Sequence, residues 1–184
     1  MSETMPELPQ PHLQGLDDAF LQFSFAIKIW SYIRRKQLPS DVFDISLTIQ
    51  EGPASLYTLK HAEFQDASRI ELAAGNNVAI CFGAVAITLW EAIREWTGVE
   101  GKDLKPSKEQ MLAALSYCIR CCFAHGTVMP TWKLDPKYRL EYKLGNRVVD
   151  LRSADGQPFE YSQIGGPDGL RILRAEAKAS GLLG

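Results

Sequence analysis

The sequence lacks a long uninterrupted apolar run. Its longest apolar-rich stretch, residues 78–90, contains 13 residues, whereas a helix that crosses a bilayer needs about 20. The first residues also lack the basic start and apolar block of a secretion signal. We therefore expect a soluble, cytoplasmic protein with no membrane segment. Residues 1–14, with Pro6, Pro9 and Pro11, are expected to form a disordered or loosely docked arm.

Cysteine and histidine are scarce, with 4 Cys and 3 His among 184 residues. Cys118, Cys121 and Cys122 fall close together on one predicted helix, where disulfide geometry is poor, and this favours a reducing compartment. One interpretation makes Cys118, Cys122 and His125 metal ligands on one helical face. No second pair of ligands elsewhere completes such a site, and buried cysteines usually behave as small apolar side chains. We expect neither a metal nor a cofactor.

The net charge of −2 conceals an asymmetry between the two parts of the chain. Residues 1–100 carry 7 basic and 13 acidic side chains, whereas residues 101–184 carry 13 and 9. A basic surplus favours an anionic partner such as RNA, although an ordinary solvated surface has the same appearance.

Helical periodicity is the strongest structural signal. Apolar residues recur at three- and four-residue steps over 16–37, 66–96, 107–125 and 170–180. Ser107 and Gln110 have the spacing of a capping box at the start of the third helix. The triplet Gly75-Asn76-Asn77 interrupts the second helix, so it either kinks the helix or lets another backbone come close.

Alternating apolar residues predict β-structure on both sides of the central helices. A short hairpin is expected within 41–60, a second over 138–151 around the turn Gly145-Asn146, and a strand over 159–164. The sequence therefore predicts a mainly α protein, with one domain over 15–184. In this domain a helical bundle (15–126) precedes a β-hairpin and a closing helix (133–181).

The most informative motif is Arg120-Cys121-Cys122-Phe123-Ala124-His125, which places an arginine and a histidine at the end of the third helix, just before Gly126. An arginine stabilises a phosphate and a histidine moves a proton near neutral pH, which together suffice to cleave RNA without a metal.

An ideal helix does not bring the two motif residues together. Each residue rotates by about 100°, so Arg120 lies about 140° away from His125. The two meet if the last turn unwinds, if the arginine side chain wraps around, or if a second chain completes the site. The alternative is structural: His125 caps the helix over the edge of the core, and Arg120 is a surface residue at the cation-favouring end.

The motif and the order of the helices over residues 16–125 resemble the HEPN superfamily (higher eukaryotes and prokaryotes nucleotide-binding). The resemblance extends to Phe123-Ala124-His125-Gly126 and Pro130-x-Trp132, which are similar to uncharacterised bacterial HEPN-like proteins. It implies an antiparallel bundle of four or five helices that often dimerises, with two facing motifs that cut single-stranded RNA without metal. Arg120 and His125 carry over as catalytic residues. Many members have a polar residue, frequently Asn, where this chain has Cys121. Some members have lost catalysis and act as binding or dimerisation modules.

We therefore expect a homodimeric, metal-independent endoribonuclease of HEPN type that acts in toxicity, phage defence or RNA turnover, with an antitoxin or other partner protein. His125 would accept the 2′-OH proton, Arg120 would neutralise the pentacoordinate phosphate, and products would carry 2′,3′-cyclic phosphates. Cys121, Asn76 and Asn77 are candidate supporting residues. The alternative is a non-catalytic module for dimerisation or for binding a nucleotide or a protein partner.

Overall fold

The computed structural model describes residues 11–38, 40–43, 47–51, 55–59, 66–107 and 109–183. The chain forms two compact units: the larger unit comprises residues 1–21 and 80–184, and the smaller unit comprises residues 22–79. The predicted single domain over 15–184 stays a prediction, because compact units are defined by contacts and not by independent folding. The mainly α character of the chain is confirmed.

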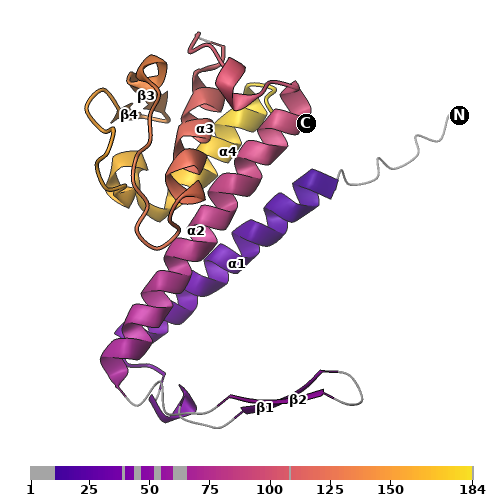
Figure 1. Cartoon of the computed structure of the whole chain (residues 1–184), viewed down its shortest axis with the longest axis vertical. Helices are drawn as coiled ribbons and strands as arrows, with labels where there is room; N and C mark the ends of the chain where they lie inside the picture. The colour runs from indigo at the N-terminus through magenta and orange to yellow at the C-terminus, as the bar shows by residue number, and fades with distance from the viewer. Residues whose placement is uncertain are drawn as a thin grey trace, which may run out of the picture. The chain divides into compact units, whose positions relative to one another are not determined.

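Three helices and a hairpin build most of the larger unit: the end of α2 (Ala67–Thr97), then α3 (Met111–Ala124), β3 (Glu141–Leu144), β4 (Arg147–Asp150) and α4 (Gly169–Ala179). The helix α3 contacts both α4 and β3, and α3 and α4 lie side by side in Figure 1. The start of α1 (Pro11–Arg34) also belongs here, and an ion pair joins its Asp17 to Arg174 of α4. The hairpin and closing helix predicted from the sequence are confirmed.

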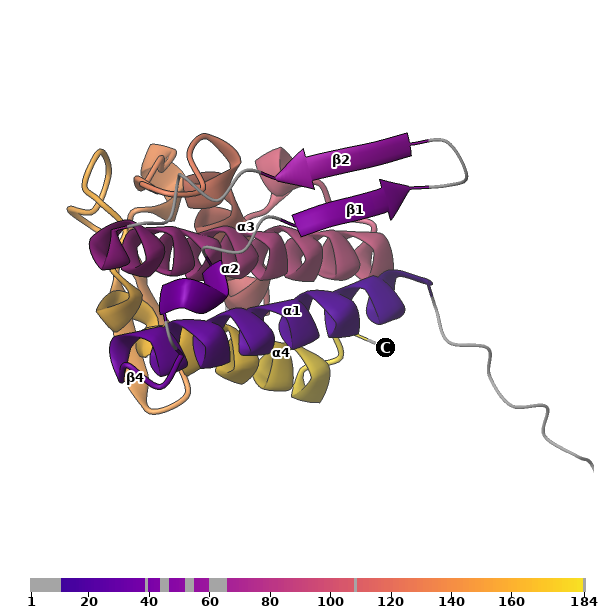
Figure 2. The ribbon, with the colours of Figure 1, turned by 90° about the horizontal axis from the view of Figure 1, so that it is seen from below.

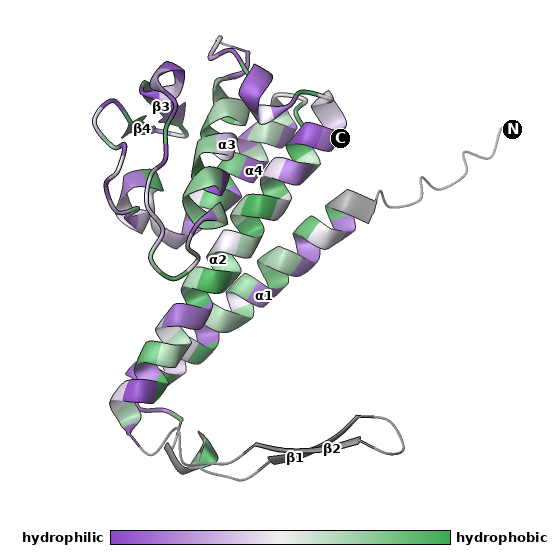
Figure 3. Cartoon of the chain, in the orientation of Figure 1, coloured by the Kyte–Doolittle hydropathy of each residue, from purple (hydrophilic) through white to green (hydrophobic). Residues whose placement is uncertain are grey.

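The core of the larger unit is built around α3, which Figure 3 shows to be rich in hydrophobic residues. Phe82, Phe123 and Phe159 stack with ring centroids 5.1 to 5.8 Å apart, and Trp132 lies 5.2 Å from Phe159. All four rings are buried. Burial of each such side chain contributes about 1.5 to 3 kcal/mol, so this cluster holds α2, α3 and the segment after α3 together.

The second hairpin has the predicted alternation. Its strands pair antiparallel, with Tyr142 opposite Val149 and Leu144 opposite Arg147. Tyr142, Leu144 and Val149 are buried and their neighbours are exposed. Gly145 has φ +58°, the left-handed conformation that a tight hairpin turn requires and that glycine adopts at little cost.

The smaller unit contains the rest of α1, the start of α2 and a first hairpin. The strands β1 (Leu47–Glu51) and β2 (Ser55–Leu59) pair antiparallel, as Figure 2 shows, with Leu47 opposite Leu59. The short hairpin predicted within 41–60 is confirmed. Arg34 and Glu71 form an ion pair at 3.2 Å between α1 and α2.

The triplet Gly75-Asn76-Asn77 lies inside the α2 helix, which continues to Thr97. A Cβ placed on Gly75 would lie 3.6 Å from the indole nitrogen of Trp30. The close neighbour at this glycine is therefore an aromatic side chain of α1.

Two predicted elements differ from the structure. The third helix begins at Met111 and not at Ser107, because Ser107 accepts the Gln110 N–H in a preceding turn and the Gln110 side chain accepts the Lys105 N–H. The segment predicted as a strand over 159–164 contains the 3₁₀ helix η5 (Tyr161–Ile164). Here Glu160 and Gln163 form the capping box that satisfies the first backbone groups of the turn.

The arm predicted over residues 1–14 overlaps the first helix. The helix α1 begins at Pro11, so residues 11–14 are helical and residues 1–10 lie outside the described part. Among the residues that the structure describes, one helix, α2, is long and apolar enough by length and composition to cross a membrane, with a mean hydropathy of 1.7 over its best window. The core helix of a soluble protein passes the same test.

Candidate functional site

His125 lies at the C-terminal end of α3 and its side chain is exposed. Its backbone (φ −111°, ψ −5°) makes it the residue that ends the helix, directly before Gly126. The structural alternative is right about this backbone position. The exposed position of His125 leaves its imidazole accessible to solvent.

Arg120 has a less ordinary environment. The residue is half-buried, and its Nε is buried without a hydrogen-bond partner among the described residues. A buried donor without a partner costs about 1 to 3 kcal/mol, and native proteins contain few of them. The guanidinium lies near Tyr117, since its charge opposes the increase in the pKa of that hydroxyl.

The structure does not bring the two predicted catalytic residues into contact. No hydrogen bond or ion pair links Arg120 to His125 in the part of the chain that the structure describes. The helix is regular through Ala124, so the route that unwinds its last turn does not apply. Two ways of bringing the residues together remain: the arginine side chain extends around the helix, or a second chain supplies one of the two residues.

Cys121 faces a small pocket of about 140 Å³ in the larger unit. The pocket is lined by residues of α3, of the η3 turn (Gly101–Asp103) and of the segment after α3: Lys102, Tyr117, Cys118, Cys121, Lys133, Asp135, Lys137 and Tyr138. Burial, and then the neighbouring Cys121 thiol, raise the pKa of Tyr117 to about 12. Burial raises that of Tyr138 to about 12 as well. Both hydroxyls are therefore neutral near pH 7.

The other two predicted supporting residues belong to the smaller unit. Asn76 is half-buried and Asn77 is exposed, both on α2. Their part in a site with Arg120 and His125 stays a prediction.

Two of the three cysteines of α3 are core residues. Cys118 and Cys122 are buried, and the Cys122 thiol donates a hydrogen bond to the Cys118 carbonyl at 3.3 Å. Burial raises the pKa of Cys118 to about 12 and also raises that of Cys122. Both thiols are thus protonated near neutral pH, whereas a metal binds the thiolate. No three His, Cys, Asp or Glu side chains are grouped as metal ligands among residues that the structure describes.

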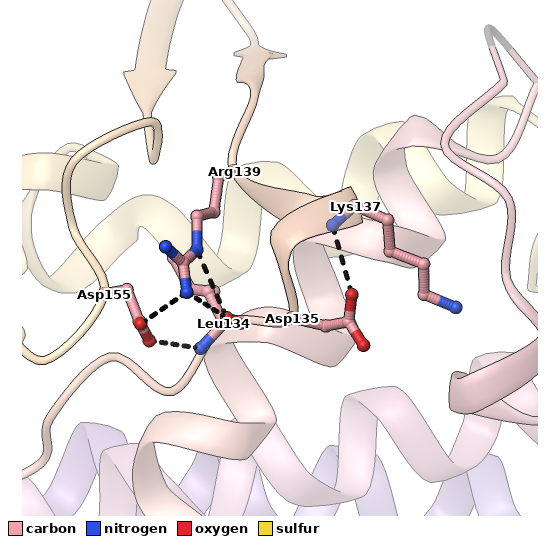
Figure 4. A network of polar contacts seen from close by, with 5 residues as sticks. All are labelled: Leu134, Asp135, Lys137, Arg139 and Asp155. Atoms are coloured by element: carbon pink, nitrogen blue, oxygen red, sulfur yellow. Dashed lines mark hydrogen bonds and ion pairs between the residues drawn. The ribbon is translucent and has the colours of Figure 1, made fainter.

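A polar network fixes the segment that follows α3 (Figure 4). The Arg139 guanidinium donates to the Asp155 carboxylate at 2.6 Å and to the Leu134 carbonyl at 3.2 Å. The other oxygen of Asp155 accepts the Leu134 N–H at 2.8 Å. Trp132 adds two backbone hydrogen bonds, to Gln157 and from Gly156, at 2.9 Å each. This segment is therefore held in place although it has almost no regular secondary structure.

The sequence analysis did not identify the basic side chains that line the pocket beside Cys121. Lys133 and Asp135 are exposed and alternate with the buried Trp132 and Leu134. That alternation over four residues was a signal for a segment with one fixed outer face, but it is too short to separate from chance.

No family model, curated protein or solved structure compared with this chain matches it.

Proposed function

We propose that the protein is a metal-independent endoribonuclease of HEPN type, built on an antiparallel helical bundle, that cleaves single-stranded RNA with Arg120 and His125. One observation carries the proposal: an exposed histidine ends α3, five positions after an arginine whose buried Nε has no partner among the described residues. A structural arginine normally has its donors satisfied. A guanidinium whose donors the fold does not use fully, on the same helix as an exposed histidine, supports a phosphate-binding role for Arg120.

In the proposed reaction His125 removes the proton from a ribose 2′-OH, and the resulting oxygen attacks the adjacent phosphorus. Arg120 stabilises the charge on the pentacoordinate phosphate. The P–O5′ bond then breaks, the 5′-oxygen leaves with a proton from water, and a 2′,3′-cyclic phosphate remains. Charge stabilisation of this kind is worth about 3 kcal/mol for each donor removed. Arg120→Ala should therefore lower the cleavage rate roughly a hundredfold.

The test is cleavage of labelled single-stranded RNA by the purified protein in EDTA. We expect cleavage by the wild type, and strong losses in Arg120→Ala and in His125→Ala. Arg152→Ala is the matched control, because that arginine is exposed and its ion pairs with Asp150 and Glu141 lie on the hairpin. No cleavage by the wild type, or equal cleavage by His125→Ala, would rule out the proposal.

We further propose that a homodimer assembles the site, because α3 is regular and separates the two side chains around its axis. Sedimentation should then give a mass about twice the chain mass of 20.5 kDa. Mixing Arg120→Ala with His125→Ala subunits should restore about a quarter of the wild-type activity if each site takes one residue from each chain. If mixtures that exchange subunits recover no activity, each site takes both Arg120 and His125 from the same chain.

The second candidate is a non-catalytic module that binds a partner protein or a nucleotide. The lack of contact between Arg120 and His125 favours it. Expression in cells separates the two functions. Growth arrest that His125→Ala relieves supports a cytoplasmic toxin or defence ribonuclease, whereas harmless expression together with a tightly bound partner supports the module.

A further inference from the structure

The pocket beside Cys121 has a cationic lining that the proposed cleavage reaction does not use. Lys102, Lys133 and Lys137 line it together with a single carboxylate, Asp135. Two charges outside the lining oppose each other: besides burial, Asp103 raises the pKa of Tyr138, and Arg120 opposes the increase in the pKa of Tyr117. The lining therefore keeps an excess of positive charge.

The lysines come from segments whose backbones are fixed. Lys133 and Lys137 belong to the segment held by the Arg139–Asp155 network and by the buried Trp132 and Tyr138. Lys102 belongs to η3, where the Tyr138 hydroxyl donates to the carbonyls of Gly101 and Leu104. One tyrosine thus ties the two lysine-bearing segments together.

The single carboxylate of the pocket is already engaged. Asp135 accepts the backbone N–H of Lys137 at 3.1 Å, which starts the turn η4 (Pro136–Tyr138). The Lys137 ammonium instead donates to the Lys102 carbonyl and lies 4.8 Å from the Tyr138 ring centre. Figure 4 shows its side chain extending beyond the Asp135 carboxylate.

Two ammonium groups lack such partners. No hydrogen bond or ion pair joins the side chains of Lys102 or Lys133 to another residue within the described ranges. A volume of about 140 Å³ is well below the 300 to 1,000 Å³, roughly, of pockets that enclose a whole small molecule. The pocket therefore suits one compact anionic group and leaves the rest of the ligand outside.

We propose that this pocket binds a phosphate group, held by the ammonium groups of Lys102, Lys133 and Lys137. Lysine acts as a point charge toward phosphate and imposes little geometry, which fits three lysines that line one pocket from two segments. The phosphate belongs either to a mononucleotide or to an RNA chain. The inference goes beyond the proposed cleavage and does not depend on it.

The test is titration calorimetry of the full chain with five probes: inorganic phosphate, adenosine 5′-monophosphate, the dinucleotide ApA, adenosine and acetate. We expect binding of at least one phosphate-bearing probe and none of adenosine. Binding of the monophosphate alone assigns a terminal phosphate, and binding of ApA assigns an internal diester. Equal binding of adenosine, or equal binding of acetate in place of phosphate, would overturn the inference.

Two variants and a control locate the binding. Lys102→Gln with Lys133→Gln should weaken binding about tenfold or more, whereas Lys143→Gln, an exposed lysine on β3, should leave it unchanged. Asp135→Asn keeps an acceptor for the Lys137 N–H and removes the negative charge, so it should tighten binding about threefold. Binding that is unchanged in the double variant contradicts the assignment, whatever the RNA-cleavage assay shows.

Discussion

Arg120 is the residue at which stability and function are expected to separate. If the half-buried side chain had a purely structural role, its substitution would lower the stability of the folded protein. A buried Nε without a partner predicts the opposite, because an apolar side chain of similar length removes a donor that costs about 1 to 3 kcal/mol.

We therefore expect Arg120→Met to unfold at the same temperature as the wild type or higher, while RNA cleavage falls roughly a hundredfold. Thermal unfolding followed by circular dichroism, beside the cleavage assay, measures both. A marked drop in unfolding temperature would show that the guanidinium is a structural element of α3.

At the scale of elements, two glycines of α2 provide a matched comparison. A Cβ on Gly75 makes an ordinary contact of 3.6 Å with Trp30, whereas a Cβ on Gly83 lies 2.9 Å from the Phe123 ring. That ring is buried and packed against Phe82 and Phe159, so it has little room to move.

Replacing glycine by alanine inside a helix gains about 1 kcal/mol from propensity, and overpacking a core costs about 1 to 3 kcal/mol. Gly75→Ala should therefore raise the free energy of unfolding and Gly83→Ala should lower it. Urea denaturation of the two variants measures the difference. Stabilisation by both would mean that Phe123 shifts freely.

Most elements were predictable from local patterns. The four helices and the Gly145-Asn146 hairpin follow from periodicity and turn chemistry. The predictions were wrong where short-range hydrogen bonds determine the local conformation. Glu160 and Gln163 cap a 3₁₀ turn in a segment whose apolar residues alternate as in a strand. In the candidate site, the exposure of His125 follows from its place at the end of a helix. The orphaned Nε of Arg120 and the lysine pocket depend on residues far apart in the chain, and no local pattern contains that information.

For the whole molecule, buried weak acids predict a loss of stability in alkali. Burial raises the pKa of Cys118 from 9.0 to about 12, and that of Tyr117 and Tyr138 from 10.0 to about 12. The folded state keeps these protons where the unfolded chain releases them. The stabilisation is therefore complete below pH 9 and decreases as the pH rises toward about 12.

Denaturant midpoints measured from about pH 8 to about pH 11 should accordingly decrease, and Cys118→Ala should make the decrease shallower. The same midpoint for the wild type across this range would contradict the burial of these groups. Midpoints that rise with pH would also contradict the burial of these groups.

The network that holds the segment after α3 has a consequence for its dynamics. Trp132 and Leu134 donate their amide protons to the Gln157 carbonyl and the Asp155 carboxylate. These two amides lie in a segment with almost no regular secondary structure, yet their deuterium uptake should be as slow as that of the interior of α3.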